Sequence, residues 1–496
     1  MGFPLHSLRH WIPFGAPEAE DAEAVALRQW LERHAQASVD KIAIGLANRI
    51  PVLAAKQKNL HMRVRLLDML RQAAEGILAA IEDDLDQASL PLPPEVQANA
   101  LAADNLLKSL ASSYGAVVGA IESRRLAAGL SHLLQASIQQ TMHLIARRQT
   151  LAYRAYAYPS PTSWLQLHQF HAIARARNIA AAHRNGSSIE NIYVRSLLLA
   201  LADPTKRSRS DLVAINGCLD NLLPLAHLTH LSNLGERDRQ SKSLFLLQSG
   251  DSRGSRPLAK MTSPPPADAL ALDTREVVAE LGRGLTRPNA ALQCPPTLAE
   301  SMIQMWSSPP SRRFTRSRVK PKADLVAGIS LVARYLQSAF TRRQSDKAGH
   351  PIMPVSEWYI VNESPDGFGL RYSRGDPGNF DVGDLVGVRP RERSRVHICL
   401  IRRVSNAGHG RFELGVQELS PLALPIPLTA DENSHSRDAI LLPRLPGFGN
   451  ASGLAAPTGV LYSGGEVIWS RNNLSFRHQL GRRVEGNHRT ELFLLA

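Results

Sequence analysis

The chain has 496 residues and a mass of 54.3 kDa, more than one ordinary hydrophobic core accommodates, so we expect three domains. Hydrophobic residues make up 44% and charged residues 21% of the sequence, and this balance excludes a wholly disordered, collagenous or fibrous chain. Lys and Arg number 58 against 44 Asp and Glu, a formal net charge of +14. This charge favours an anionic partner, which can be a nucleic acid, a nucleotide, or an acidic protein or lipid surface.

The cysteine usage and the N-terminal segment indicate a cellular compartment. Cys218, Cys294 and Cys399 stand too far apart for a CxxC site, and an odd, sparse set is a poor disulfide framework. The N-terminal segment lacks the unbroken apolar core and small-residue cleavage site of a signal peptide. No apolar run approaches the roughly 18–20 residues that span a bilayer. We therefore expect a soluble cytoplasmic protein in a reducing environment.

The region from about residue 20 to 230 carries apolar side chains at helical spacing. The clearest stripes lie within 66–81, 106–121 and 134–145, and breakers such as Pro51 and Gly129 separate the helical patterns. No convincing tetratricopeptide period is present, so a loose helical repeat and an irregular bundle both remain open. This part of the chain is predicted to be an all-helical array or bundle.

The Ser-, Pro- and Gly-rich stretch 251–267 is typical of a linker, and two short helices are expected after it, at about 274–284 and 297–306. From about residue 323 the pattern changes to short β-rich runs separated by Gly, Asp, Asn and Pro turns. These runs predict an antiparallel barrel or sandwich. The expected strands are 357–361, 369–372, 385–388, 396–401 and 412–419, followed by 439–442, 459–462, 466–469, 474–478 and 490–495.

The predicted organisation is therefore an α+β multidomain chain. It places a helical domain at 1–250, a linker with short helices at 251–307, a β-barrel at 308–421 and additional strands at 422–496. The additional strands either extend the barrel or form a small second β unit. The net charge is concentrated near the start of the barrel, since residues 301–350 hold ten Lys and Arg against two Asp, a net +8. The site for an anionic partner is expected there.

Two motifs flank the first strands of this β region. Arg312, Arg313 and Arg316 lie in a Pro-flanked RxxxR segment, and arginines can grip a phosphate or the O6/N7 edge of guanine with two hydrogen bonds. The spacing is weak evidence alone, because Arg391 and Arg395 repeat it and are expected to be solvated charges on a strand edge.

The second motif is the hexapeptide 362–367, at the end of a strand-like run. The short polar side chains of Asn362 and Ser364 can read a purine edge, and Gly367 allows the backbone to turn or to approach a ligand closely. The alternative for this hexapeptide alone is an Asx or Ser turn that closes a hairpin.

The order of these features resembles the PilZ domain family, with RxxxR, then (D/N)xSxxG at a strand end, then Gly-bearing strands at Gly383 and Gly415. The resemblance covers roughly residues 310–421. It implies a small β-barrel that binds the bacterial second messenger cyclic di-GMP. The ligand-binding residues that it implies are Arg312, Arg313, Arg316, Asn362, Ser364 and Gly367. One departure is a helix-like insertion at 331–345 between the two motifs, which costs only loop-closure entropy.

The sequence supplies no case for catalysis. HExxH, the GxxxxGK[ST] phosphate loop and a GxGxxG after a strand do not occur, and the one GxSxG match, at 250–254, runs into the linker rather than a helix. The pairs His6/His10 and His168/His171 have helical spacing but no evident third ligand. We therefore expect a non-enzymatic cyclic di-GMP receptor without a cofactor, whose helical region transmits binding to a protein partner. The alternatives are a basic nucleic-acid-binding protein and a degenerate PilZ-like scaffold that binds no nucleotide.

Overall fold

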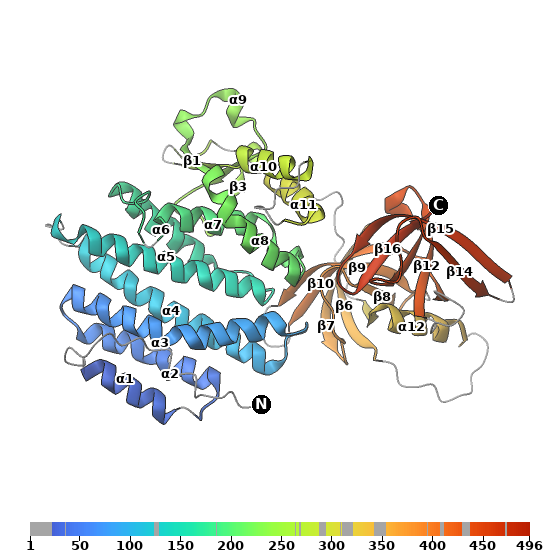
Figure 1. Ribbon diagram of the computed structural model, residues 1–496, viewed down its shortest axis with the longest axis horizontal. Coiled ribbons are helices and arrows are strands. Elements are labelled where there is room, and N and C mark those ends of the chain that lie inside the picture. Colours follow the sequence, from blue (N-terminus) through green and yellow to red (C-terminus); the bar gives the residue numbers. More distant parts are fainter. Residues whose placement is uncertain are drawn as a thin grey trace. The chain divides into compact units, whose positions relative to one another are not determined.

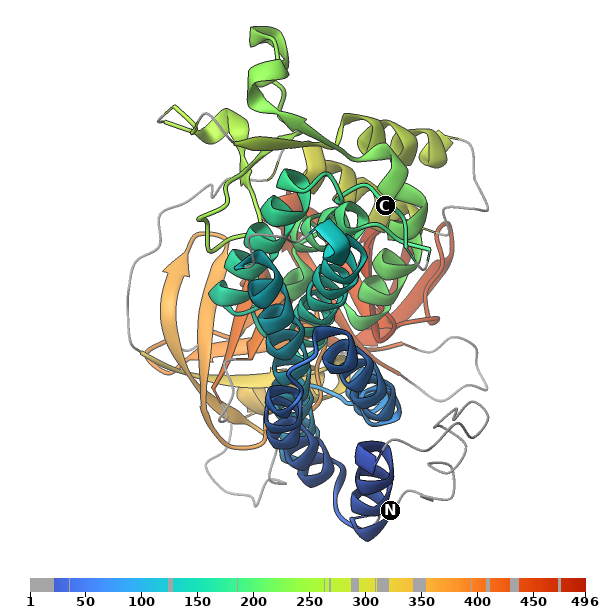
Figure 2. The same ribbon diagram turned by 90° about the vertical axis from the view of Figure 1, so that its left-hand side faces the viewer.

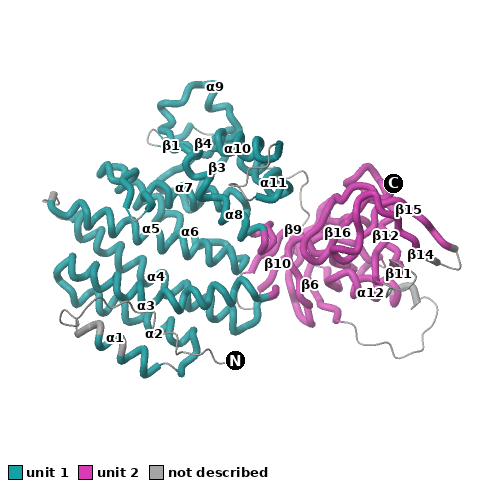
Figure 3. Tube along the Cα trace, viewed as in Figure 1, with its two compact units in different colours: residues 1–88, 92–204, 211–310 teal, residues 89–91, 205–210, 311–496 magenta. Residues whose placement is uncertain are grey.

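The computed structural model describes residues 22–496 apart from residues 35, 124–127, 185, 263, 267–268, 287–293, 308, 310–320, 342–353, 394, 407–410, 429–436 and 472–473. The chain divides into two compact units (Figure 3). Unit 1 comprises residues 1–88, 92–204 and 211–310, and unit 2 comprises residues 89–91, 205–210 and 311–496. Their secondary structure confirms the predicted order, in which a helical region precedes antiparallel β-structure.

Unit 1 begins with long helices that lie side by side (Figure 1). They are α1 (Ala22–Arg33), α2 (Val39–Lys56), α3 (Leu60–Gln87), α4 (Pro94–Glu122), α5 (Ser131–Arg154), α6 (Pro161–Ala176), α7 (Ile189–Leu201) and α8 (Arg209–Leu222). Helix α4 packs against α2, α3 and α5 and buries the predicted apolar stripe, with Leu106, Leu110 and Val117 fully covered. This burial is the main source of helix stability, because isolated amphipathic helices are marginal in water.

Local signals set several helix boundaries. The side chain of Asn59 caps α3 by accepting a hydrogen bond of 2.9 Å from the backbone N–H of His61. Ser188 caps α7 in the same way through the N–H of Asn191. Prolines occupy the first turn of α4 and α6, where their missing N–H costs nothing.

The segment that was expected to be a linker is folded into unit 1. A four-stranded sheet of order β1-β4-β2-β3 is formed by β1 (His227–His230), β2 (Leu244–Leu247), β3 (Arg256–Pro257) and β4 (Leu270–Asp273). The short α9 (Glu236–Arg239) lies within this region, and α10 (Arg275–Thr286) and α11 (Pro296–Ser307) follow it, drawn in green to yellow in Figure 2. Leu246, Leu258 and Ala271 share one core, so buried leucines hold a stretch whose Ser and Pro content is typical of a linker.

Unit 2 contains a closed six-stranded barrel of order β10-β7-β6-β5-β8-β9. Its strands are β5 (Lys322–Ala327), β6 (Ser356–Ser364), β7 (Gly367–Arg374), β8 (Leu385–Pro390), β9 (His397–Asn406) and β10 (Phe412–Ser420). The interior is filled by alternating apolar side chains such as Trp358, Leu370 and Leu414. The predicted insertion between the motifs contains a helix, α12 (Ile329–Thr341).

The additional strands form a six-stranded sheet of their own, of order β11-β12-β13-β16-β15-β14. They are β11 (Leu424–Leu428), β12 (Arg437–Leu445), β13 (Ala451–Pro457), β14 (Glu466–Arg471), β15 (Leu474–Gly486) and β16 (Thr490–Leu495). The sheet shares a core with the barrel and α12, in which Val332 and Leu400 join Ile440. Residues 459–462 are not a strand as expected but part of a loop, which turns at Gly459 with φ +84°.

Candidate functional site

The second predicted motif lies in the hairpin of β6 and β7. Ser364 pairs with Gly367 and Asn362 pairs with Gly369 across the two strands. The hydroxyl of Ser364 donates a hydrogen bond of 3.3 Å to the carbonyl of Gly367, so this side chain helps to close the two-residue turn. The carbonyl of Asp366 in that turn accepts a bond of 2.9 Å from the N–H of Glu418 in β10. The hexapeptide 362–367 therefore closes a hairpin turn and also presents polar side chains at the end of β6, so the two predicted roles are compatible.

Two glycines allow the hairpin to lie close to its neighbours. Gly367 has φ +143°, and a Cβ there would come within 2.1 Å of the carbonyl oxygen of Val416. A Cβ at Gly369 would come within 2.5 Å of Nδ2 of Asn362. Side chains at these positions would displace either the β10 backbone or the Asn362 amide, so both glycines have a steric reason.

The arginine motif, Arg312, Arg313 and Arg316, lies outside the described residues, and the structure therefore does not place it against the second motif. The chain that follows it is described from Pro321. The carbonyl of Pro321 accepts a hydrogen bond of 2.9 Å from the N–H of Ile360, two residues before Asn362. In the β5–β6 register Lys322 pairs with Tyr359 and Ala323 with Trp358, so the chain traced back from β5 runs toward Asn362.

A known protein family matches this region of the chain. Residues 332–425 match the family model described as the middle PilZ domain of the cyclic-di-GMP receptor FimW. The barrel is a PilZ domain. The match covers the second motif, while the arginine motif lies before its first residue.

Other parts of the chain are similar to the same receptor. Residues 25–233 match the model of the N-terminal domain of the same receptor. The chain is 20% identical to the cyclic-di-GMP receptor FimW of Pseudomonas aeruginosa, over 93% of this chain and 88% of that protein. No solved structure matches the chain.

A network of buried carboxylates binds four strands of the PilZ domain together, and sequence reasoning missed it. Asp324 in β5 and Glu357 in β6 are both buried. Arg391 is exposed, as expected of a solvated charge, but it also bonds Asp324 at 3.0 Å and Glu357 at 2.8 Å, and these ion pairs were not expected. Further cations join at Lys322, Arg374 and Arg389. The hydrogen bond from Lys322 is the main cause that lowers the pKa of Glu357 to about 2.

Other candidate centres lie in unit 1. His168 and His171 are buried, and His168 contacts the hydroxyl of Tyr193 at 2.5 Å and the carbonyl of Arg253 at 2.8 Å. His6 and His10 lie outside the described residues. The GxSxG match lies between β2 and β3, with no helix directly after it. Among the residues that the structure describes, no group of three His, Cys, Asp or Glu could hold a metal ion, and no helix could cross a membrane.

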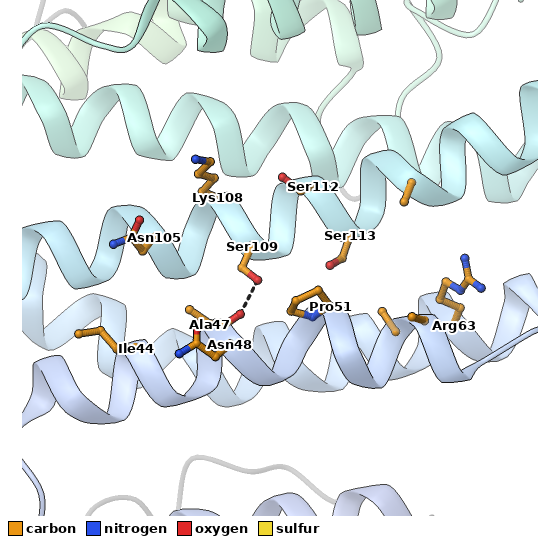
Figure 4. A pocket seen from close by; sticks show the side chains of 13 residues that line it. Ile44, Ala47, Asn48, Pro51, Arg63, Asn105, Lys108, Ser109, Ser112 and Ser113 are labelled. Atoms are coloured by element: carbon orange, nitrogen blue, oxygen red, sulfur yellow. Dashed lines mark hydrogen bonds between the residues drawn. The ribbon is translucent and has the colours of Figure 1, made fainter.

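A groove of about 620 Å³ runs between α2 and α4 in unit 1 (Figure 4). Its walls combine small and apolar side chains such as Ala47, Pro51 and Ala116 with the polar groups of Asn48 and Asn105. The charged side chains that line it are those of Arg63 and Lys108, and both are basic.

Proposed function

We propose that this chain is a receptor that binds cyclic di-GMP at its PilZ domain, with Arg312, Arg313 and Arg316 on one side of the ligand and Asn362, Ser364 and Gly367 on the other. The observation that carries the proposal is the hydrogen bond from the N–H of Ile360 to the carbonyl of Pro321. It joins the segment that follows the arginines in the chain to β6, two residues before Asn362. Arg316 is five residues from Pro321, and five extended residues span at most about 17 Å, before the reach of the side chain is added.

The chemistry of the two motifs suits this ligand. Cyclic di-GMP presents two phosphates and two guanines in one compact ring. Arginine side chains bind a phosphate or a guanine edge through two parallel N–H donors. Short amide and hydroxyl side chains can form hydrogen bonds with the remaining polar atoms of the guanine edge. Gly367 and Gly369 let the hairpin pack closely against β10 and the Asn362 amide, which fixes the place of the polar strand end.

The proposed role is binding without catalysis. The ligand leaves unchanged, and no cofactor takes part. Nucleic acid is a less suitable partner, because the basic segment 301–350 interleaves few aromatic side chains with its arginines, and stacking platforms require them.

We also propose that unit 1 binds a protein partner, and that the α2–α4 groove receives an amphipathic helix with acidic side chains. The stretches 44–55 and 105–116 that line the groove each cover about 16 Å, or three helical turns. Lys108 is exposed and makes no ion pair or hydrogen bond to a described residue. A carboxylate on a docked helix would complement it, in the helix-in-groove mode of peptide recognition.

Charge reversal tests this docking surface. A photocrosslinker at Ser112 in the full chain should capture a helical partner segment, Lys108→Glu should abolish the capture, and Lys58→Glu outside the groove should leave it intact. Crosslinking that is indifferent to Lys108→Glu would refute the acidic helix as the occupant.

Calorimetric titration of the full chain with cyclic di-GMP tests the receptor. We expect saturable binding and weaker binding by Asn362→Ala and Arg316→Ala, with the nucleotide recovered intact afterwards. Absence of binding would favour the degenerate scaffold. Submicromolar binding of DNA or RNA at physiological salt, unaffected by cyclic di-GMP, would favour the alternative of a basic nucleic-acid-binding protein.

A further inference from the structure

Four strands of the PilZ domain bring one residue each into a single row. Asn362 of β6 pairs with Gly369 of β7, Gly369 pairs with Gly415 of β10, and Gly415 pairs with Arg403 of β9. Directly paired residues of antiparallel strands point to the same face of a sheet. The row therefore runs Asn362, Gly369, Gly415, Arg403 and spans three strand spacings, about 14 Å.

This row lies on the outer face of the barrel. Side chains alternate between the two faces of a strand, and the neighbours of both glycines are buried in the interior. Phe368 and Leu370 flank Gly369, and Leu414 and Val416 flank Gly415, each with 5% or less of its surface exposed. The two glycines thus form a floor that carries no side chain of its own between Asn362 and Arg403; Gly369 is buried, and Gly415 is partly exposed.

The polar side chains at the two ends lean over this floor. The nearest atom to a Cβ built on Gly369 would be Nδ2 of Asn362, at 2.5 Å. A Cβ on Gly415 would meet the Cβ of Arg403 at 3.3 Å and its Nε at 3.6 Å. Because Gly369 and Gly415 are direct partners, the Asn362 amide and the Arg403 side chain converge from opposite ends of the row.

Within the described part of the chain, the side chain of Arg403 differs from its neighbours on this face in having no hydrogen-bond or ion-pair partner. Arg402 donates to Gln417 at 2.8 Å and pairs with Glu485, and Arg371 pairs with Glu413 at 2.8 Å. The side chain of Arg403 makes no hydrogen bond or ion pair to any residue that the structure describes. It is half-buried, so its guanidinium is held against the barrel without having its charge neutralised.

We propose that Arg403 is a further ligand-contacting residue, which reads a guanine base lying over Gly415, between the Asn362 amide and the Arg403 guanidinium. The inference rests on the proposed function and adds a residue that neither motif contains. Guanine offers two acceptors, O6 and N7, to a guanidinium, whereas adenine offers N7 beside an amino donor. Arg403 therefore selects guanine over adenine, and the Asn362 amide contacts the same ring from the opposite end.

The test is calorimetric titration of the full chain with cyclic di-GMP and with cyclic di-AMP. Arg403→Ala should weaken cyclic di-GMP binding roughly 5- to 150-fold, with a smaller loss for cyclic di-AMP, so that the preference for guanine shrinks. Arg403→Lys keeps the charge but not the paired donors and should lose the same preference. Arg395→Ala removes an exposed arginine just before β9 and should bind as the wild type does.

Two results would overturn the assignment of Arg403 while the receptor stands. One is wild-type affinity in Arg403→Ala, and the other is an equal loss for both nucleotides, which would indicate a general charge effect. The melting temperature of each apo variant reports separately on folding and should match that of the wild type. Failure of the wild-type chain to bind cyclic di-GMP would instead refute the proposed function, and Arg403 with it.

Discussion

The Asn362 side chain lies over Gly369, its partner across the β6–β7 hairpin, at a distance that leaves no room for a methyl group on residue 369. The polar end of β6 and the glycine of β7 that it covers are thus two parts of one arrangement. A motif residue is held in place by a glycine that stands outside the motif, two residues after its last member.

Gly369→Ala should therefore weaken cyclic di-GMP binding about tenfold or more, because the new Cβ must displace the Asn362 amide from its place in the site. Stability should fall by less than about 1 kcal/mol, since the atom that must move is the end of a flexible side chain. Titration and thermal unfolding measure the two effects. Gly447→Ala, at a glycine with nothing within 4 Å of its Cβ position, is the matched control and should change neither.

Gly367→Ala should act on the fold rather than on the ligand alone. The backbone at Gly367 has φ +143°, and a Cβ would meet the Val416 carbonyl at 2.1 Å, an atom of the backbone that cannot turn aside. We expect a loss of about 3 kcal/mol or more in the free energy of unfolding. Scanning calorimetry of the full chain should show a lower transition for the PilZ domain. An unchanged thermogram would mean that the hairpin does not lie against β10 as described.

The buried carboxylates make a prediction for arginine. Arg391→Ala should destabilise the PilZ domain by about 1–2 kcal/mol, because Asp324 and Glu357 each lose a charged donor while other cations remain. Arg395→Ala should change stability by less than about 0.5 kcal/mol, since Arg395 is exposed. Equal effects of the two substitutions on chemical denaturation would contradict the network.

The same network predicts a dependence on pH. The pKa of Glu357 is lowered to about 2 in the folded chain, chiefly by the hydrogen bond from Lys322, while an unfolded Glu titrates near 4.3. The stabilisation is therefore fully present above about pH 5 and is lost as the pH falls through the folded value near 2. Melting temperatures measured between pH 5 and 2.5 should fall more steeply for the wild type than for Glu357→Gln. Parallel curves would contradict this assignment.

The sequence predicted the elements better than their pairing. Helical stripes such as Leu106, Leu110 and Val117 are buried as expected, because periodicity reports directly on which face is covered. The (D/N)xSxxG pattern located a polar strand end at Asn362 for a similar reason, since its turn chemistry is local. The role of Gly369 and Gly415 depends on register, and bulges at 360–362 and at 415–416 shift that register in a way that no local pattern reveals.

Ion pairs between residues far apart in the chain could not be predicted from the sequence either. Arg391 looked like a solvated strand-edge charge, because its partners lie 67 and 34 positions earlier in the chain, at Asp324 and Glu357. Residues 251–267 looked like a linker, because composition averages over the few leucines, such as Leu258, that anchor the segment in a core. Both differences arise where one or two contacts outweigh the average properties of a stretch.

Hydrogen–deuterium exchange of the full chain with and without cyclic di-GMP tests the central claim most directly, because it reports where the ligand binds. We predict that the nucleotide slows exchange in peptides covering Arg312–Arg316 and the hairpin 360–370, and that Ser364→Ala reduces the protection at both. Peptides of the α2–α4 groove in unit 1 should not gain comparable protection. Protection confined to unit 1, or none at all at saturating nucleotide, would contradict the assignment of the PilZ domain as the cyclic di-GMP site.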